Sequence, residues 1–182
     1  MSVLIRTGLI DDVEAIRKVA LTDEDPSVSL SAEQLVERMQ LFPHGYAVSE
    51  LDGEIVGYMA TCRMREFEYE RLEHIPGWDL LHDPVGANLY VSSVIVHPKT
   101  RGRGLLKDLM RNRIEYAIGE RMDFIQLVSI RSAEEMYPGK TRVHMYETLG
   151  FRAVREMESQ HDGVCTLMQL GLANKGNNLA KS

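Results

Sequence analysis

A strand, a basic glycine-rich turn and a helix follow one another from residue 90 onward, and this run most constrains the fold. "YVSSVIVHP" (90–98) is rich in β-branched residues and ends at a proline. After "KTRGRG", apolar residues recur with helical spacing from Gly104 to Glu120, and "DFIQLVSI" (123–130) is a continuous apolar run typical of a buried strand. A strand, helix and strand in this order predict a parallel, right-handed crossover.

The elements before the crossover are a strand, two helices and a hairpin. "VLIRTG" (3–8) predicts a first strand, and a helix from Asp11 to Leu21 follows, with Asp11 and Glu14 at the spacing of a capping box. A second helix is predicted from Ser31, because Gln34 stands three residues later. Two β-rich runs then meet at "DG" (52–53), a dipeptide that favours a tight hairpin turn because both residues tolerate positive φ.

The elements after the crossover complete a mixed sheet. A short helix is expected from Thr141 to Leu149, followed by the strands "FRAVREME" (151–158) and "VCTLMQLGL" (164–172). The resulting order predicts an α+β fold of three layers (α/β/α), whose mostly antiparallel sheet has one parallel crossover between strands 4 and 5. We expect one domain over residues 1–172, and a flexible tail over 173–182.

Composition excludes several classes of function. A net charge of −6 argues against a surface built for nucleic-acid phosphates, so any anion site must be local. The two cysteines, Cys62 and Cys165, are far apart in sequence, which predicts neither a disulfide framework nor a metal site. No secretion signal and no run of roughly 20 apolar residues is present. We therefore expect a cytoplasmic protein with no metal, nucleic-acid or membrane partner.

The basic turn between strand and helix has the properties of an anion site. Backbone N–H groups at a helix start lack partners within the helix, and the helix dipole adds positive potential there. Gly102 and Gly104 carry no Cβ that would keep a ligand from the backbone. The surrounding basic residues are Lys99, Arg101, Arg103 and Lys107. The spacing suits a diphosphate, although a plain solvated loop remains an alternative for the turn taken alone.

Two common phosphate-binding loops do not fit this turn. A P-loop requires Gly-Lys-Ser/Thr at the start of the helix, whereas Gly104 is followed by Leu105 and Leu106. A dinucleotide-binding fingerprint requires a third glycine at position 107, which is Lys107. Nucleotide hydrolysis and dinucleotide binding are therefore disfavoured.

Arg101-Gly102-Arg103-Gly104-Leu105, directly after "SSVIVHP", resembles the acetyl-CoA loop of the GCN5-related N-acetyltransferases (GNAT family). "YETLGFRAV" (146–154) is similar to the helix-to-strand junction of the same family, and the resemblance spans residues 3–171. One departure is Leu106, which stands where the family usually has Gly or Ala.

The resemblance implies how acetyl-CoA would bind. The backbone of one strand segment would pair with the pantetheine amides, and the basic turn would hold the diphosphate. The implied binding residues are Val94, Ile95, Val96, Arg101, Gly102, Arg103, Gly104, Leu105 and Leu106. In this family the strand commonly bulges and parts from the next strand, so we expect a bulge near Ser92 or Ser93.

Acetyl transfer to an amine places three demands on the site. The amine must lose a proton, because alkylammonium groups have a pKa of about 10.4. The oxyanion needs a donor, for which a backbone N–H within 94–96 is the natural candidate. The departing thiolate benefits from a proton, and the family pattern places Tyr146 to supply it. The alternative for Tyr146 is an aromatic ring packed between helix and sheet.

The long connection at residues 65–89 is the predicted acceptor side. It contains six acidic residues against Arg65 and Arg71, a bias that would favour a cationic substrate if the segment lines the cleft. We hypothesise that it forms an acceptor lid. Glu66 and His82 are the candidates for the general base.

The sequence therefore favours an enzyme that moves an acetyl group from acetyl-CoA to the primary amine of a small or amino-acid-like molecule. Two alternatives stay open: acetylation of proteins or peptides, and a noncatalytic CoA-binding sensor. A homodimer is also open, because terminal strands of such folds often pair between subunits.

Overall fold

The computed structural model describes residues 2–23, 29–66, 82–130, 142–159 and 163–172. The middle of the predicted lid (67–81) and the predicted tail (173–182) lie outside these ranges. Within them, one mixed sheet extends from residue 3 to residue 171, with helices on both faces.

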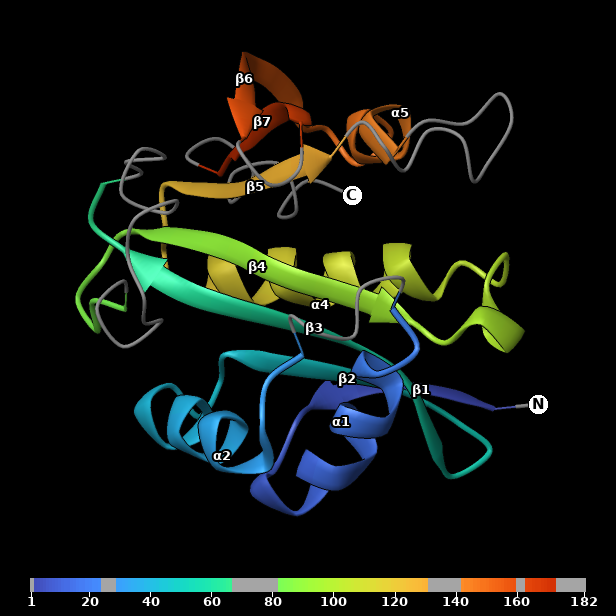
Figure 1. Cartoon of the computed structure of the whole chain (residues 1–182). Helices are drawn as coiled ribbons and strands as arrows, with labels where there is room; N and C mark the ends of the chain where they lie inside the picture. Colours follow the sequence, from blue (N-terminus) through green and yellow to red (C-terminus); the bar gives the residue numbers. More distant parts are fainter. Residues whose placement is uncertain (1, 24–28, 67–81, 131–141, 160–162, 173–182) are drawn as a thin grey trace, which may run out of the picture.

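Seven strands form the sheet in the order β1-β2-β3-β4-β5-β7-β6 (Figure 1). Their bounds are β1 Val3–Thr7, β2 Tyr46–Leu51, β3 Glu54–Met64, β4 Asn88–Val96, β5 Phe124–Ile130, β6 Arg152–Ser159 and β7 Gly163–Gly171. Among the described strands, only β4 and β5 are parallel neighbours, and all other pairs are antiparallel. The predicted fold class and its single parallel crossover are confirmed.

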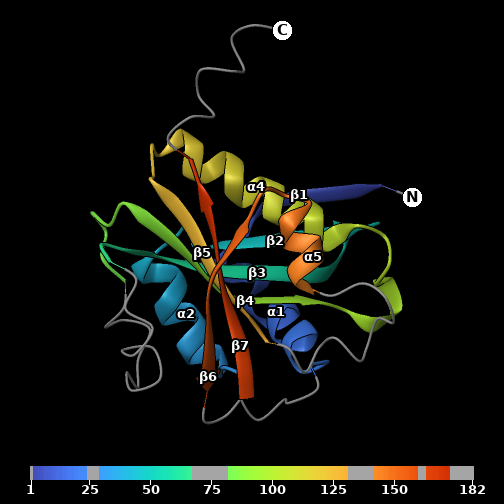
Figure 2. The same ribbon diagram turned by 90° about the horizontal axis from the view of Figure 1, so that it is seen from above.

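Helices cover both faces of the sheet (Figure 2). The helices α1 (Val13–Ala20) and α2 (Ala32–Leu41) lie on one face, and α4 (Leu105–Gly119) and α5 (Arg142–Glu147) on the other. Short 3-10 turns, η1 (Ile10–Asp12) and η4 (Pro98–Thr100), precede α1 and α4. In the described part of the chain, no helix is long and apolar enough to cross a membrane.

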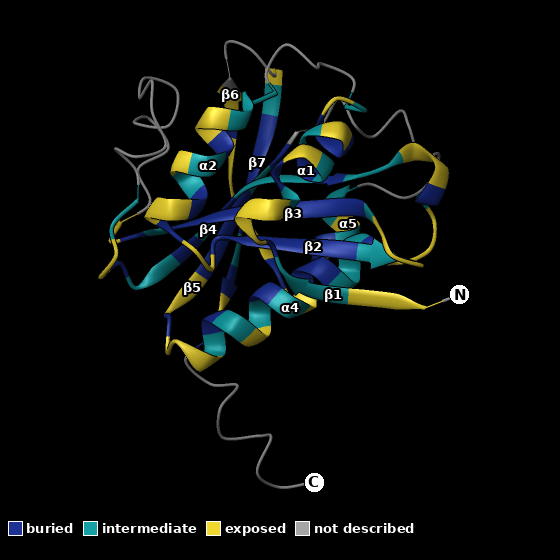
Figure 3. Cartoon of the chain, turned by 90° about the horizontal axis from the view of Figure 1, so that it is seen from below, coloured by how far each residue is buried: buried dark blue, intermediate teal, exposed yellow. Residues whose placement is uncertain are grey.

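Two hydrophobic cores lie between the sheet and the helices, one on each face of the sheet. The first, called the α1/α2 core, contains Ile16, Leu35, Met39, Tyr46, Val48, Tyr58 and Ile95. The second, called the α4 core, contains Met59, Leu89, Leu109, Met110, Ile125, Tyr146 and Met168. Figure 3 shows the buried sides of α1 and α2 against the sheet and their exposed sides facing outward. The strand side chains named above therefore point either to the α1/α2 face or to the α4 face of the sheet.

Two local predictions are confirmed. Ser31 Oγ accepts a hydrogen bond from the Gln34 N–H (3.2 Å), and Gln34 Oε1 accepts one from the Ser31 N–H (2.9 Å), which is a complete capping box. At the hairpin, Asp52 and Gly53 adopt φ values of 51° and 89°, as the dipeptide predicts.

The start of α1 differs from the prediction. No capping box forms between Asp11 and Glu14, and the residue at the helix start is Asp12. The Asp12 carboxylate accepts hydrogen bonds from the Leu9 N–H (2.7 Å) and from two guanidinium nitrogens of Arg6 (2.6 and 2.9 Å). A cation on β1 therefore decides which of two adjacent aspartates starts the helix.

The Asp12 ion pair predicts a pH-dependent stability. Hydrogen bonds from Arg6 hold the pKa of Asp12 below its ordinary value, so folding favours the ionised carboxylate. This stabilisation is complete above the pKa of an unfolded aspartate, about 3.9, and disappears as pH falls through the lower folded value. Asp12→Asn should lower the free energy of unfolding by about 1–2 kcal/mol near neutral pH, and by less below about pH 4. Urea unfolding of both proteins across this range tests the expectation.

Asp11→Asn is the matched control, because Asp11 is exposed in the same turn. A cost for Asp12→Asn that does not change with pH, or an equal cost for Asp11→Asn, would contradict the assignment.

Candidate functional site

The strand β4 contains a bulge at Ser92. Opposite β3, Ala60 pairs with Ser93 while Thr61 pairs with Val91, which leaves Ser92 as the extra residue. The Ser92 hydroxyl donates a hydrogen bond to Ala60 O (3.2 Å). The bulge therefore lies where the sequence predicted it.

The strands β4 and β5 separate directly after the bulge. They pair only over four positions, from Asn88 with Phe124 to Val91 with Leu127. Beyond this point β4 continues along β3 to Val96, and β5 continues along β7 to Ile130. Figure 1 shows the two strands diverging toward their carboxyl ends. From Ser92 onward, one edge of β4 has no partner among the described strands.

The backbone of Val94 and Val96 faces this open edge. His97 N–H donates to Val56 O on β3 (2.8 Å), and peptide groups alternate between the two edges along a strand. Those of Ile95 therefore face β3, and those of Val94 and Val96 face the side that β5 has left. The Val96 carbonyl accepts a hydrogen bond from Arg101 Nε (3.3 Å), in agreement with this direction.

Ile95 departs from the predicted binding role. Its backbone is used in the ladder with Tyr58, and its side chain is buried in the α1/α2 core. The side chains of Val94 and Val96 pack instead against the α4 core. The physical reason is the two-residue period of a strand, which places alternate peptide groups at opposite edges.

The basic turn after β4 brings backbone groups to the surface at the start of α4. Gly102 and Gly104 adopt φ values of 79° and 83°, and Gly104 is the residue that starts α4. A Cβ added at either glycine would meet no atom within 4 Å, so space is open above both. Gly102, Arg103 and Gly104 are exposed and Arg101 is half-buried. This geometry suits an anion approaching the N-terminus of α4.

The two leucines that follow the turn have different surroundings. Leu105 is buried, so its side chain belongs to the core and only its backbone can serve a ligand. Leu106, at the position where the family usually has a small residue, is half-buried and packs against the α4 core.

Tyr146 lies at the junction of α5 and β6. It is buried in the α4 core, with its ring centroid 5.8 Å from that of Phe151. Burial raises the pKa of Tyr146 to about 12, so its hydroxyl is protonated at neutral pH. A buried, protonated Tyr146 is compatible with both roles considered from the sequence, an aromatic ring packed between helix and sheet and a proton donor.

His82 and Glu66 lie away from the bulge. The His82 ring stacks on Phe42, a member of the α4 core, with the centroids 4.7 Å apart. Its Nδ1 accepts a hydrogen bond from the Arg63 N–H (3.3 Å), and burial lowers its pKa. Glu66 is exposed beyond the end of β3. Arg63 stands three residues past Ala60, so both predicted base candidates lie about 10 Å or more along β3 from the bulge.

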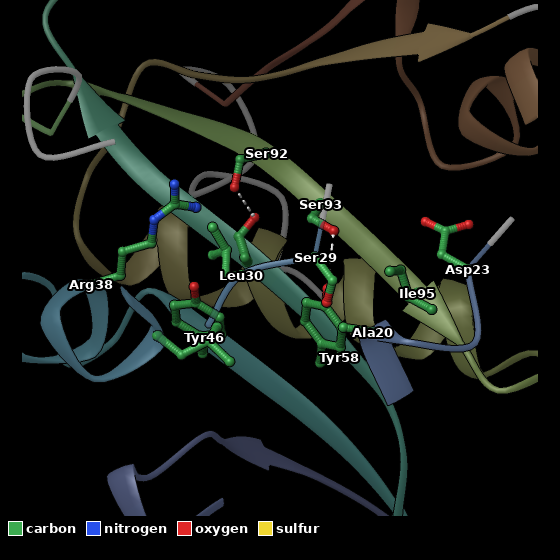
Figure 4. A pocket seen from close by; sticks show the side chains of 12 residues that line it. Ala20, Asp23, Ser29, Leu30, Arg38, Tyr46, Tyr58, Ser92, Ser93 and Ile95 are labelled. Atoms are coloured by element: carbon green, nitrogen blue, oxygen red, sulfur yellow. Dashed lines mark hydrogen bonds between the residues drawn. The ribbon is translucent and has the colours of Figure 1, made fainter. Parts of the chain in front are cut away.

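A pocket of about 270 Å³ lies on the α1/α2 face of the bulge (Figure 4). Ser92 and Ser93 of β4 form part of its wall, and Tyr46 of β2 and Tyr58 of β3 project into it. The open edge of β4 and this pocket therefore meet at the same two serines.

Hydroxyl groups give the pocket its polar character. The rings of Tyr46 and Tyr58 are stacked with centroids 6.5 Å apart, and the Tyr58 hydroxyl lies 3.4 Å from Ser93 Oγ. The Tyr46 hydroxyl and Ser29 Oγ are buried in the wall of the pocket. Burial raises the pKa of Tyr46 to about 12, against the opposing effect of Arg38. Tyr46 thus presents a protonated hydroxyl to the cavity.

The sequence did not identify this pocket. Its residues come from separate elements: Asp23 follows α1, Arg38 belongs to α2, and the tyrosines stand on β2 and β3. The sequence feature that could have indicated the pocket was the presence of Tyr46 and Tyr58 on the two strands of one hairpin. These two tyrosines occupy diagonal positions across the hairpin.

Residues 13–151 match the profile of the Acetyltransferase (GNAT) family. This chain belongs to that family. Within the described ranges, no three His, Cys, Asp or Glu residues are grouped as metal ligands would be.

Two curated relatives come from Bacillus subtilis (strain 168). The uncharacterized N-acetyltransferase YkwB is 30% identical over 99 residues, which cover 51% of this chain and 43% of YkwB. The probable hydrolase YhcX is 30% identical over 131 residues, which cover 63% of this chain and 25% of YhcX. The matched segment is thus less than half the length of either relative.

Solved GNAT structures share the fold. The loading GNATL domain of CurA from Lyngbya majuscula superposes with a TM-score of 0.78 at 14% identity, over 96% of this chain and 100% of that domain. YncA, a putative acetyltransferase from Salmonella typhimurium solved with acetyl-CoA, gives 0.68 at 20% identity, over 94% and 95%. At these identities the similarity concerns the fold alone.

The left-handed conformation of Gly104 leads to a stability prediction. Gly104→Ala should lower the free energy of unfolding by about 1–2 kcal/mol, because a Cβ is disfavoured at positive φ even where space is open. Gly119→Ala, at the other end of α4 and also without a close neighbour, should be neutral or slightly stabilising. Urea unfolding of the two variants measures the difference, and equal effects would contradict the conformational requirement at Gly104.

Proposed function

We propose that this protein transfers an acetyl group from acetyl-CoA to the primary amine of a small or amino-acid-like molecule. The observation that carries the proposal is the meeting of two features at the bulge of β4. The free backbone edge of Val94 and Val96 leads to the basic turn, and the pocket opens on the other face at Ser92 and Ser93. An acetyl donor bound along the open edge and an amine bound in the pocket could reach each other only where these two features meet.

The residues around the open edge fit acetyl-CoA. The Val94 carbonyl and the backbone groups of Val96 pair with the pantetheine amides as a neighbouring strand would. The N–H groups from Gly102 to Leu106 bind the diphosphate at the start of α4, and Arg101 and Arg103 supply positive charge. The positive φ of both glycines and the open space above them support close approach of phosphate oxygens. Ile95 contributes only to the pocket wall.

The chain's own groups assist a direct transfer. The amine nitrogen forms a bond to the acetyl carbon, the carbon–sulfur bond breaks, and one amine proton leaves to solvent or a base. The Val94 N–H, directed to the open edge, stabilises the charge on the carbonyl oxygen. Tyr146 gives its proton to the departing sulfur. His82 is a poor choice for the base, because its ring packs against the α4 core whereas the pocket lies on the opposite face.

The size of the pocket favours a compact acceptor. A volume of about 270 Å³ is at the lower end of small-molecule sites. A peptide could place one residue in it at most. Cys62 and Cys165 are both buried, and the proposal includes a reducing, cytoplasmic location. A homodimer through the edge strand β6, where Val154 is exposed, is a further proposal.

An assay of thiol release from acetyl-CoA tests the function. The purified protein is incubated with small amines, amino acids and peptides, and CoA binding is measured separately by calorimetry. We expect acetyl-CoA binding and thiol release that depends on a small amine. Turnover with peptides alone would identify a peptide acetyltransferase, and CoA binding without turnover across the panel would identify a sensor.

Tyr146→Phe tests the proton donor. Loss of the hydroxyl should lower kcat by about 10- to 100-fold with little change in acetyl-CoA affinity, because the thiolate must then leave unprotonated. With a pKa of about 12, Tyr146 should cause no loss of rate on the alkaline side below about pH 11. Tyr116→Phe is the matched control, because Tyr116 is a half-buried tyrosine of α4 to which no role in the transfer is assigned. Full turnover and an unchanged pH profile in Tyr146→Phe would remove this residue from the mechanism.

A further inference from the structure

We propose that the acceptor amine carries a carboxylate, which Arg38 binds at one end of the pocket while the amine lies toward Asp23 at the other end. This inference rests on the proposed function and specifies the substrate class of the same site. It follows from three properties of the pocket: opposite charges at its two ends, a buried tyrosine hydroxyl beside the positive end, and an apolar middle.

The charges lie on opposite sides of the cavity. Arg38 of α2 and Asp23 after α1 both line the pocket, and Figure 4 shows them on either side of Tyr46 and Tyr58. Both act on the same tyrosine, because the pKa of Tyr58 is raised by Asp23 and lowered by Arg38 in addition to the larger effect of burial. A zwitterion aligned along the pocket would meet an opposite charge at each end.

A buried hydroxyl stands ready for an acceptor oxygen. Tyr46 is fully buried and lines the pocket beside Arg38, which lowers the pKa of Tyr46 through its charge and by hydrogen bonding, against the larger effect of burial. Together, a tyrosine hydroxyl and a guanidinium form a donor pair that suits an oxygen entering the cavity. Arg38 influences the pKa of Tyr46, which places the guanidinium close to this hydroxyl. A carboxylate beside Arg38 could accept hydrogen bonds from both groups.

The middle of the pocket accepts only a compact, apolar linker. Leu30, Leu35 and Ile95 line it together with the faces of the two tyrosines. Along β4, Ser92 and Ser93 precede Val94, whose N–H faces the open edge, and Ile95 lies at the far end of the lining. Figure 4 shows Asp23 at the Ile95 end of the lining, so an amine there would lie one residue along β4 from Val94, whose N–H would meet the acetyl group.

Other acceptor classes fit this charge pattern poorly. A diamine would place its second cation beside Arg38, where like charges repel. A simple alkylamine would offer no acceptor oxygen to Arg38 and the Tyr46 hydroxyl. A site built from hydrogen-bonding groups rejects analogues that lack the matching group, so discrimination against both classes is expected.

Matched acceptors test the proposal directly. The panel consists of α- and ω-amino acids of increasing chain length, the corresponding amides, and alkylamines and diamines of equal length. For each compound, kcat/KM is measured by thiol release, and binding to the protein with CoA present is measured by calorimetry. We expect the amino acids to be preferred over their amides by about 10-fold or more in both measurements.

Variants locate the recognition. Arg38→Gln should lower kcat/KM and affinity for the carboxylated amines by about 10- to 100-fold, and change those of the amides by less than about threefold. Arg38→Lys should retain part of the preference, because the charge remains without the bidentate geometry. Arg17→Gln, the same change on the exposed part of α1, is the control. Tyr46→Phe should weaken carboxylate binding while leaving the Tm unchanged or raised, which a purely structural tyrosine would not do.

The outcomes separate this inference from the function on which it rests. Turnover of amides or alkylamines equal to that of amino acids, or equal losses for both classes in Arg38→Gln, would overturn the inference and leave the acetyltransferase function standing. Carboxylate-dependent binding in the presence of CoA without turnover would sustain the inference and overturn the proposed function. Absence of any carboxylate-dependent binding overturns the inference whatever the turnover.

Discussion

The bulge at Ser92 is the feature on which the rest of the site depends. One extra residue in β4 coincides with the end of its pairing with β5, so the backbone beyond it has a partner strand on one side only. Unpaired peptide groups inside a sheet are costly unless a ligand or water satisfies them. A fold that keeps such an edge open between two strands has a built-in place for an extended, amide-containing ligand.

The two sides of the bulge are constructed in different ways. The turn from Arg101 to Gly104 and the start of α4 are contiguous in sequence, so their geometry is fixed by local backbone preferences. The pocket on the other face is assembled from α1, α2, β2, β3 and β4 and depends on how these elements pack. A donor site encoded in one continuous motif can thus stay constant while the acceptor site varies, because substitutions in the pocket need not disturb the turn.

Local signals in the sequence predicted local structure well. Ser31 with Gln34 and the Asp52-Gly53 turn occur as expected, since side chain and backbone interact there within a few residues. Asp12 replaced Asp11 at the start of α1 because Arg6, on a neighbouring strand, selects the carboxylate it can reach. The sequence also did not predict the position of Arg113. Its side chain is buried on the inner side of α4 and donates a hydrogen bond to His44 O (2.6 Å), and burial lowers its pKa to about 10.

By itself, the sequence determined the order of elements, the single parallel crossover, the glycine turn before α4 and the approximate position of the bulge. The first three depend on periodicity or on backbone conformations that few residues tolerate, whereas the bulge was expected from the resemblance to the GNAT family. Only the tertiary structure decided that Val94 and Val96, and not Ile95, face the open edge, and that His82 lies on the face opposite the pocket. It also brought Arg38, Tyr46 and Asp23 together, because side chains from separate elements meet only where strand register and helix packing place them.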